Sequence, residues 1–315
     1  MRRIFYFCPD FPLPSAGTKR LYRHVCHLNR LGFDAYIVHQ KRPFILSWHG
    51  YEAPVIWVED NPTFLNEDIL VFPEAMTNIM NMTKDFPCRR IVIVLNWAYI
   101  HTNLPKGENW KDYNIKRAIT PSPFIKDFVE WSMGMDVTLI GNFVDHQKYY
   151  YDPFQKELKI SYMARKDLSG EILHSIFLKK ESVLQNYKWV HLKDLDEEKY
   201  SRHILESKIF LATSPQEGMP TSVLEAMASG CIVIGFSGVG GNDYMIDKGE
   251  GQNCFMVENG NFPLLGKNLE EIIYKLGKNE NRFDSIINNA VKTAQQFQDY
   301  ENEGESLKQY FLSLS

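Results

Sequence analysis

The sequence lacks a hydrophobic run long enough to span a membrane, and it has few cysteines. Its 315 residues contain no apolar stretch of the roughly 20 residues that a transmembrane helix needs. The apolar residues after Met1 are too few for a signal peptide, because Pro9 and Asp10 interrupt them at once. We therefore expect a cytoplasmic protein. The five cysteines show no metal-ligand spacing, which predicts reduced thiols packed mostly in the core.

An excess of positive charge is also absent. Lys and Arg number 35 against 39 Asp and Glu, for a net charge of −4, which argues against a nucleic-acid partner because such proteins need a basic face. The glycine-rich stretch 237–244 does not have the GxGxxG spacing of a dinucleotide fold, so an NAD-dependent dehydrogenase is disfavoured. The content of 44% hydrophobic residues is that of an ordinary folded protein, and the length fits two domains.

Short apolar runs alternate with helical stretches along the whole chain. Such alternation predicts an α/β protein with parallel sheets, because buried parallel strands read as continuous apolar runs. The expected strands are 3–8, 33–39, 54–57, 68–72, 90–95, 117–120, 137–140, 158–163, 189–192, 208–212 and 231–236. A helix is expected to begin at Pro73, and others to cover 170–184 and 282–300. We place a domain boundary near Asp145.

The stretch Thr213–Gly230 carries the strongest signal. Glu217 and Glu225 are separated by seven residues, Gly218 allows a tight turn, and Pro220 suits the first turn of a helix that ends before Gly230. A helix start behind a glycine turn suits an anion such as a diphosphate, and paired carboxylates suit sugar or ribose hydroxyls. An alternative is that Ser222 and Glu225 form only a capping box.

The run Glu217-Gly218-Met219-Pro220, continued by Leu224-Glu225-Ala226-Met227-Ala228-Ser229-Gly230, resembles the E-x(7)-E signature of the retaining group 1 glycosyltransferases, glycosyltransferase family four. The resemblance implies the GT-B fold, with two facing Rossmann-like domains, parallel sheets and a cleft between them. It implies an acceptor-side domain over 1–145, a nucleotide-sugar donor domain over 146–302, and a C-terminal helix over 303–315 that crosses back to the first domain.

The resemblance also implies roles for particular residues. Glu217 would hold the transferred sugar and Glu225 the ribose, while Arg165 and Lys166, directly after a strand, would balance the charge of the leaving diphosphate. On the acceptor side, either Asn96 or His101 would take the polar role that follows the strand 90–95. Further donor-binding candidates are Gly218, Met219, Thr221, Ser222, Gly240 and Gly17. Gly17 stands in a glycine turn at the start of the first expected helix.

Asp194-Leu195-Asp196 has the spacing of a DxD metal motif. It directly precedes a helical stretch, where Asp is an ordinary cap, and nothing nearby indicates Mg²⁺ or Mn²⁺. We therefore expect neither a metal nor a cofactor, with the nucleotide-diphosphate sugar acting as donor substrate.

The sequence thus predicts a metal-independent, retaining hexosyltransferase that moves a sugar from a nucleotide-diphosphate sugar to a hydroxyl acceptor in polysaccharide or glycoconjugate synthesis. The acceptor would be a sugar or a lipid-linked sugar, and a lipid-linked acceptor would allow a peripheral membrane contact. The sequence does not specify the oligomeric state. The alternatives are a GT-B-like nucleotide-sugar isomerase and a non-catalytic glycosyltransferase-like binding subunit. The presence of Glu217, Glu225 and Arg165 favours catalysis.

Overall fold

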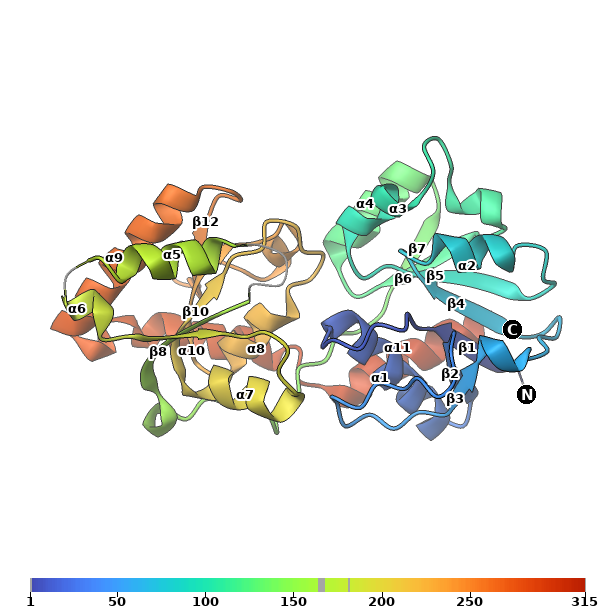
Figure 1. The fold of residues 1–315 in the computed structure, drawn as a ribbon, viewed down its shortest axis with the longest axis horizontal. Coiled ribbons are helices and arrows are strands. Elements are labelled where there is room, and N and C mark those ends of the chain that lie inside the picture. Colours follow the sequence, from blue (N-terminus) through green and yellow to red (C-terminus); the bar gives the residue numbers. More distant parts are fainter. Residues whose placement is uncertain (1, 164–167, 181, 315) are drawn as a thin grey trace. The chain divides into compact units, whose positions relative to one another are not determined.

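The computed structural model describes residues 2–163, 168–180 and 182–314, and it folds into two units with one parallel sheet each (Figure 1). The first unit comprises Met1–Asn142 and Glu301–Ser315, and the second comprises Phe143–Tyr300. The chain therefore passes between the units twice, at Asn142/Phe143 and at Tyr300/Glu301. Within the described residues, no helix has the length and apolar character of a membrane span.

The first unit is built on a seven-stranded sheet of order β3-β2-β1-β4-β5-β6-β7. Its strands are β1 (Arg3–Phe7), β2 (Asp34–His39), β3 (Val55–Trp57), β4 (Ile69–Pro73), β5 (Arg89–Ile93), β6 (Arg117–Thr120) and β7 (Asp136–Leu139). Its helices are α1 (Ala16–Arg30), α2 (Thr77–Met82), α3 (Ile100–Asn103), α4 (Pro123–Met133) and α11 (Tyr300–Ser313).

Side chains alternate across this sheet, as the pleat requires. Ile4 and Tyr6 pack with α1 and α11 on one face, whereas Phe5 and Phe7 pack with α2, α3 and α4 on the other (Figure 1). The C-terminal helix α11 is fastened to α1 by a buried ion pair, in which the Arg23 guanidinium donates to both carboxylate oxygens of Glu303 at 2.5 and 2.8 Å. The helix that ends the chain is thus part of the core of the first unit.

The second unit is built on a five-stranded parallel sheet of order β12-β11-β10-β8-β9. Its strands are β8 (Glu157–Tyr162), β9 (Lys188–His191), β10 (Ser207–Ala212), β11 (Ile232–Phe236) and β12 (Phe255–Val257). Its helices are α5 (Ser169–Phe177), α6 (Ser182–Gln185), α7 (Glu197–Glu206), α8 (Thr221–Ala228), α9 (Phe262–Lys278) and α10 (Asp284–Gln295). Ile209 and Leu211 face the layer of α5 and α9, and Phe210 and Ala212 face α7, α8 and α10.

Three local expectations are wrong. Pro73 ends strand β4, and the next helix begins only at Thr77. Two helices, α5 and α6, stand where one helix was expected over 170–184. The long helix expected over 282–300 is shorter in the structure, where α10 spans Asp284–Gln295. The short strand β12 was not expected, because its three residues show too little pattern to stand out. Each difference lies at a helix boundary or at a sheet edge, where local sequence signals are weakest.

Candidate functional site

The Glu217–Glu225 motif lies at the point of the second sheet where the strand order reverses. Strands β8 and β10 are neighbours in the sheet, although β9 lies between them in the sequence. In open parallel sheets, ligands bind beyond the carboxyl ends of the strands at such a reversal. The hydroxyl of Thr213 donates to the Met163 carbonyl at 3.0 Å and so ties the ends of the two strands together.

The backbone of Glu217 is paired with the glycine loop that follows β11. The Glu217 N–H donates to the Gly238 carbonyl at 2.8 Å, and the Gly240 N–H donates to the Glu217 carbonyl at 3.1 Å. These bonds accompany a parallel bridge between Glu217 and Val239. Val239 itself has a φ of 77°, a conformation that costs a β-branched residue on the order of 1–3 kcal/mol. The loop thus fixes the base of the Glu217 side chain and stores strain in doing so.

Gly240, a predicted donor-site residue, allows this pairing by its lack of a side chain. A Cβ placed on Gly240 would lie 1.7 Å from the Gly218 oxygen. Gly218 and Met219 are both buried beneath it in the motif loop. The predicted glycines therefore bring two strand-end loops into direct backbone contact.

Helix α8 begins two residues earlier than the capping-box alternative requires. Pro220 occupies the cap position without a side-chain cap bond, so Thr221 and Ser222 are the first two helical residues. A capping box would need Ser222 to precede the helix, and that alternative is therefore wrong. The hydroxyl of Tyr244 donates to the Pro220 carbonyl at 2.8 Å and holds the helix start in place. The Val223 N–H donates to the Pro220 carbonyl at 3.0 Å, and the N–H groups at the start of a helix generally suit an anion.

Glu225 is buried, with 5% of its surface exposed. Its Oε2 accepts a hydrogen bond of 2.8 Å from the hydroxyl of Tyr200 on the neighbouring helix α7. Burial, followed by the negative charge of Glu225, raises the pKa of Tyr200 well above its usual value, so the hydroxyl keeps its proton and donates. Sequence reasoning missed Tyr200, whose only signal was its place in the polar helix that precedes β10.

Arg165 and Lys166, the predicted diphosphate partners, lie outside the described residues. The segment that leads to them is described up to Met163, whose carbonyl accepts the bond from Thr213.

The remaining predicted residues belong to the first unit. Gly17 lies in the first turn of α1, where an added Cβ would stand 3.1 Å from Leu95 Cδ1. Asn96 is buried, and its side-chain oxygen accepts from the Ala98 N–H at 2.9 Å to cap the short helix η2 (Trp97–Tyr99). The carboxylate of Glu74, also missed from sequence, accepts from the N–H groups of Leu95 and Asn96 at 3.1 and 2.9 Å. The start of α1 and the end of β5 therefore meet at one edge of the first sheet.

His101 is exposed on α3, and its ring packs edge-on against Phe128 of α4 with 6.0 Å between ring centres. Its described surroundings are thus an aromatic cluster, in which Phe128 also contacts Trp97 and Trp131. Of the two predicted acceptor-side residues, Asn96 is the one that directly follows the sheet edge.

Asp196 of the DxD sequence caps helix α7. Its Oδ1 accepts from the Lys199 N–H at 2.8 Å, as expected for a helix cap. Asp194 takes a left-handed backbone conformation with a φ of 53°. Throughout residues 2–163, 168–180 and 182–314, no three His, Cys, Asp or Glu side chains gather as a metal site would require.

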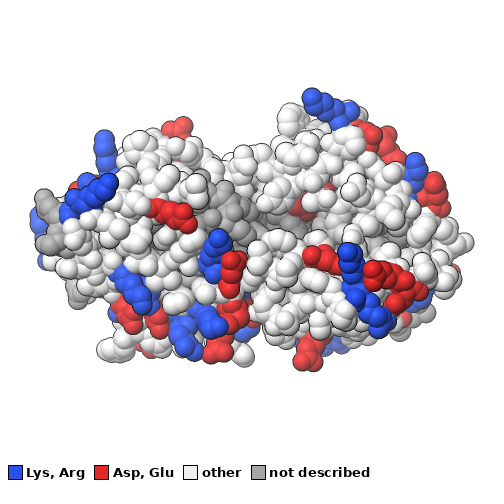
Figure 2. All heavy atoms as spheres, viewed as in Figure 1, with Lys and Arg blue, Asp and Glu red and all other residues white. Residues whose placement is uncertain are grey.

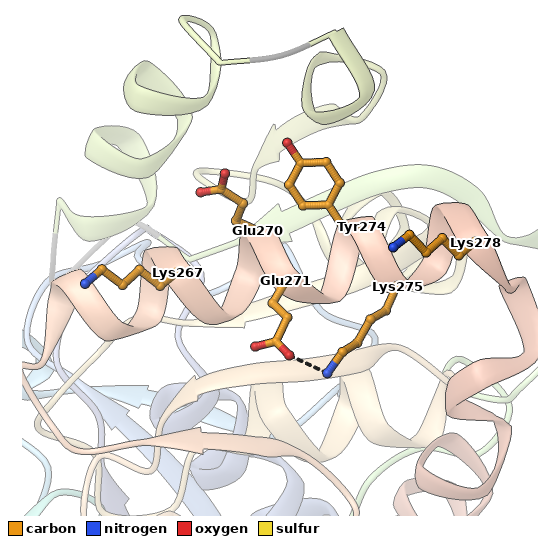
Figure 3. Close-up of a pocket in the computed structure, with 6 residues that line it drawn as sticks. All are labelled: Lys267, Glu270, Glu271, Tyr274, Lys275 and Lys278. Carbon is orange, nitrogen blue, oxygen red and sulfur yellow. Dashed lines mark ion pairs between the residues drawn. The ribbon is translucent and has the colours of Figure 1, made fainter.

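A shallow depression of about 430 Å³ runs along the outer surface of α9 (Figure 3). Its lining residues are Lys267, Glu270, Glu271, Tyr274, Lys275 and Lys278. The Glu271 carboxylate pairs with Lys275 along the helix, and Glu270 pairs with Lys180 at 2.6 Å. All six residues come from one solvated helix and none from a strand end, so this surface lacks the features of a substrate site.

On the face in Figure 2, acidic and basic side chains are interspersed, in keeping with the small net charge.

The chain is similar in sequence to known glycosyltransferases. A sequence profile of the family described as glycosyl transferases group 1 matches residues 174–293, a range that contains the whole Glu217–Glu225 motif. An alpha-1,6-glucosyltransferase of Actinobacillus pleuropneumoniae serotype 7 (strain AP76) is 27% identical over 244 residues, covering 74% of this chain and 72% of the relative.

Solved structures match over the whole chain. Sucrose-phosphate synthase from Thermosynechococcus elongatus matches with a TM-score of 0.75 at 10% identity, over 100% of this chain and 99% of the other. Anabaena HepE in complex with UDP-glucose matches with a TM-score of 0.72 at 14% identity, over 99% and 100% of the two chains. The fold is therefore GT-B, with two Rossmann-like domains that each carry a parallel sheet. The resemblance to group 1 glycosyltransferases is confirmed.

Proposed function

We propose that this protein transfers a sugar from a nucleotide-diphosphate sugar to a hydroxyl acceptor with retention of anomeric configuration. One observation carries the proposal: two carboxylates, Glu217 and Glu225, are held at the strand-order reversal of the second sheet by separate partners. Paired acceptors beside a helix start suit a sugar and a ribose joined by a diphosphate. The group 1 match over 174–293 supports the assignment.

The roles of the residues follow from their chemistry. Glu217 accepts bonds from hydroxyls of the transferred sugar, and Glu225 from hydroxyls of the ribose. Arg165 and Lys166 balance the charge that builds on the leaving diphosphate, with the first-turn N–H groups of α8. The second domain is then the donor side. Gly17 and Asn96 belong to the first domain, which we assign to the acceptor.

UDP-glucose is the first donor to test, and a glucose-containing saccharide the first acceptor. HepE was solved with UDP-glucose, and the A. pleuropneumoniae relative is a glucosyltransferase whose name specifies a 1,6 linkage. We further propose that transfer needs no metal, takes place in the cytoplasm and serves polysaccharide or glycoconjugate synthesis. The rejected DxD sequence supports the metal-independent mechanism, because Asp196 already serves as a helix cap.

The test is a Glu217→Ala variant, with Glu250→Ala at an exposed position of the same domain as control. Loss of a group that acts on the transferred sugar should lower kcat by about 10²-fold, measured as UDP release from UDP-glucose with saccharide acceptors. UDP affinity should change little, because Glu225 still holds the ribose. An E217A protein that turns over every accepted nucleotide sugar at the parental rate would remove Glu217 from the mechanism. Nucleotide binding by the parent without any turnover would favour the non-catalytic subunit.

A further inference from the structure

Glu225 meets a physical requirement that its neighbours must satisfy. A carboxylate with 5% exposure loses most of its water, and such burial is costly unless hydrogen bonds replace that water. Tyr200 supplies one such bond, from its hydroxyl to Oε2 at 2.8 Å. A bond to a defined oxygen also restricts rotation of the carboxylate, so its other oxygen, Oε1, keeps one position. A carboxylate accepts hydrogen bonds and donates none, which suits it to hydroxyl donors such as those of a ribose.

Tyr200 is itself held by a rigid element. Helix α7 is capped by Asp196 and is joined to the start of the second unit by a 2.6 Å ion pair between Glu197 and Lys148. The ring of the fully buried Tyr149 packs edge-on against the ring of Tyr200, with 6.3 Å between their centres. The position of the Tyr200 hydroxyl is therefore set by the packing of α7 and not by a mobile surface side chain.

We propose that Tyr200 is a positioning residue that orients Glu225 toward the ribose of a bound nucleotide, and that this pair makes the site selective for ribose over dideoxyribose. The inference rests on the proposed function, because it takes Glu225 as the ribose acceptor. A site built to receive hydroxyl donors discriminates against an analogue that lacks them, since the analogue cannot form the hydrogen bonds that those hydroxyls make to the carboxylate. Tyr200 does not touch the ligand in this arrangement and acts only through the geometry of Glu225.

The experiment compares UDP with 2′,3′-dideoxy-UDP by titration calorimetry on the full chain. The parent should bind UDP at least about tenfold more tightly than the dideoxy compound. Tyr200→Phe should weaken UDP binding about three- to tenfold and leave the dideoxy compound within about twofold, because only the ribose bonds depend on carboxylate orientation. The kcat at saturating UDP-glucose should stay within about twofold. Tyr150→Phe, at a tyrosine that is 42% exposed, is the matched control and should change neither affinity.

Two outcomes would overturn the inference. Y200F that weakens UDP and the dideoxy compound equally would show a general structural role, and a parent without ribose preference would remove the role of the pair. A parent that binds no nucleoside diphosphate would instead refute the proposed function, and the inference with it.

A second variant serves as a control if Y200F is unstable, because Y200F removes a hydrogen bond from a buried carboxylate. The double variant Y200F/E225A removes that charge, and its UDP affinity should equal that of E225A alone, since Tyr200 then has nothing to orient. Weaker binding by the double variant would also overturn the inference.

Discussion

Replacing Gly240 by alanine should displace the loop that carries Glu217. The new Cβ would lie 1.7 Å from the Gly218 oxygen and 2.9 Å from the Glu217 oxygen, and both are backbone atoms that cannot rotate away. Because real Cβ contacts essentially never fall below 3.0 Å, the backbones of Gly240 and Gly218 must move apart, by about 1.3 Å in all. A misplacement of about 1 Å costs on the order of 10²-fold in rate, and overpacking costs about 1–3 kcal/mol of stability.

The assay is kcat/KM for UDP release from UDP-glucose, together with the melting temperature. G240A should lose about two orders of magnitude in kcat/KM and about 2–4 °C in melting temperature per kcal/mol of lost stability. Gly241→Ala should do less harm, because the nearest atom to its Cβ is the flexible end of Met245 at 2.8 Å. Gly251→Ala, with its nearest contact at 3.8 Å, should behave like the parent. A G240A protein with parental kcat/KM and melting temperature would refute the claim that the two loops fix each other.

Two further predictions concern the helices around the sites. Burial lowers the pKa of His24 from 6.5 to about 4. Between pH 6.5 and pH 4, His24 therefore takes up a proton only in the unfolded chain. The free energy of unfolding should fall by about 1.4 kcal/mol per pH unit as the pH drops through this range. His24→Gln should flatten this dependence of the melting temperature on pH, and an unchanged slope would contradict the assignment. Asp196→Ala should cost about 1 kcal/mol through the lost cap of α7. Transfer by the parent and by D196A should survive EDTA. If the parent instead strictly required a divalent cation, and D196A abolished that metal-dependent activity, the DxD sequence would be restored as a metal site.

Much of the fold could be predicted because parallel strands are buried on both faces and read as apolar runs. Strands β10 and β11 were expected within one residue of their observed bounds, since α8 between them is delimited by Pro220 and Gly230. Gly230 indeed takes a left-handed conformation just past the helix, with a φ of 71°. Local rules succeed where the backbone has one strong constraint at each end of an element.

The contacts that hold the candidate site could not be predicted, because they join residues far apart in the sequence. Ser222 and Glu225 have the spacing of a capping box, but Pro220 starts the helix earlier and Glu225 is bonded to Tyr200 instead. Arg20 lies near the start of α1, yet its side chain is buried and donates to Asn142. Burial of this kind depends on how α1 and α11 pack on the sheet, which no local pattern specifies.

The two carboxylates of the motif are held by independent means, and this separates their functions experimentally. Glu217 is fixed through its backbone by the loop after β11, whereas Glu225 is fixed through its side chain by Tyr200 of α7. A change at Gly240 should therefore reduce sugar transfer more than UDP affinity, and a change at Tyr200 should reduce UDP affinity more than the rate at saturation. If both variants instead lowered affinity and rate in the same proportion, the motif would act as one unit, and the assignment of sugar to one carboxylate and ribose to the other would lose its basis.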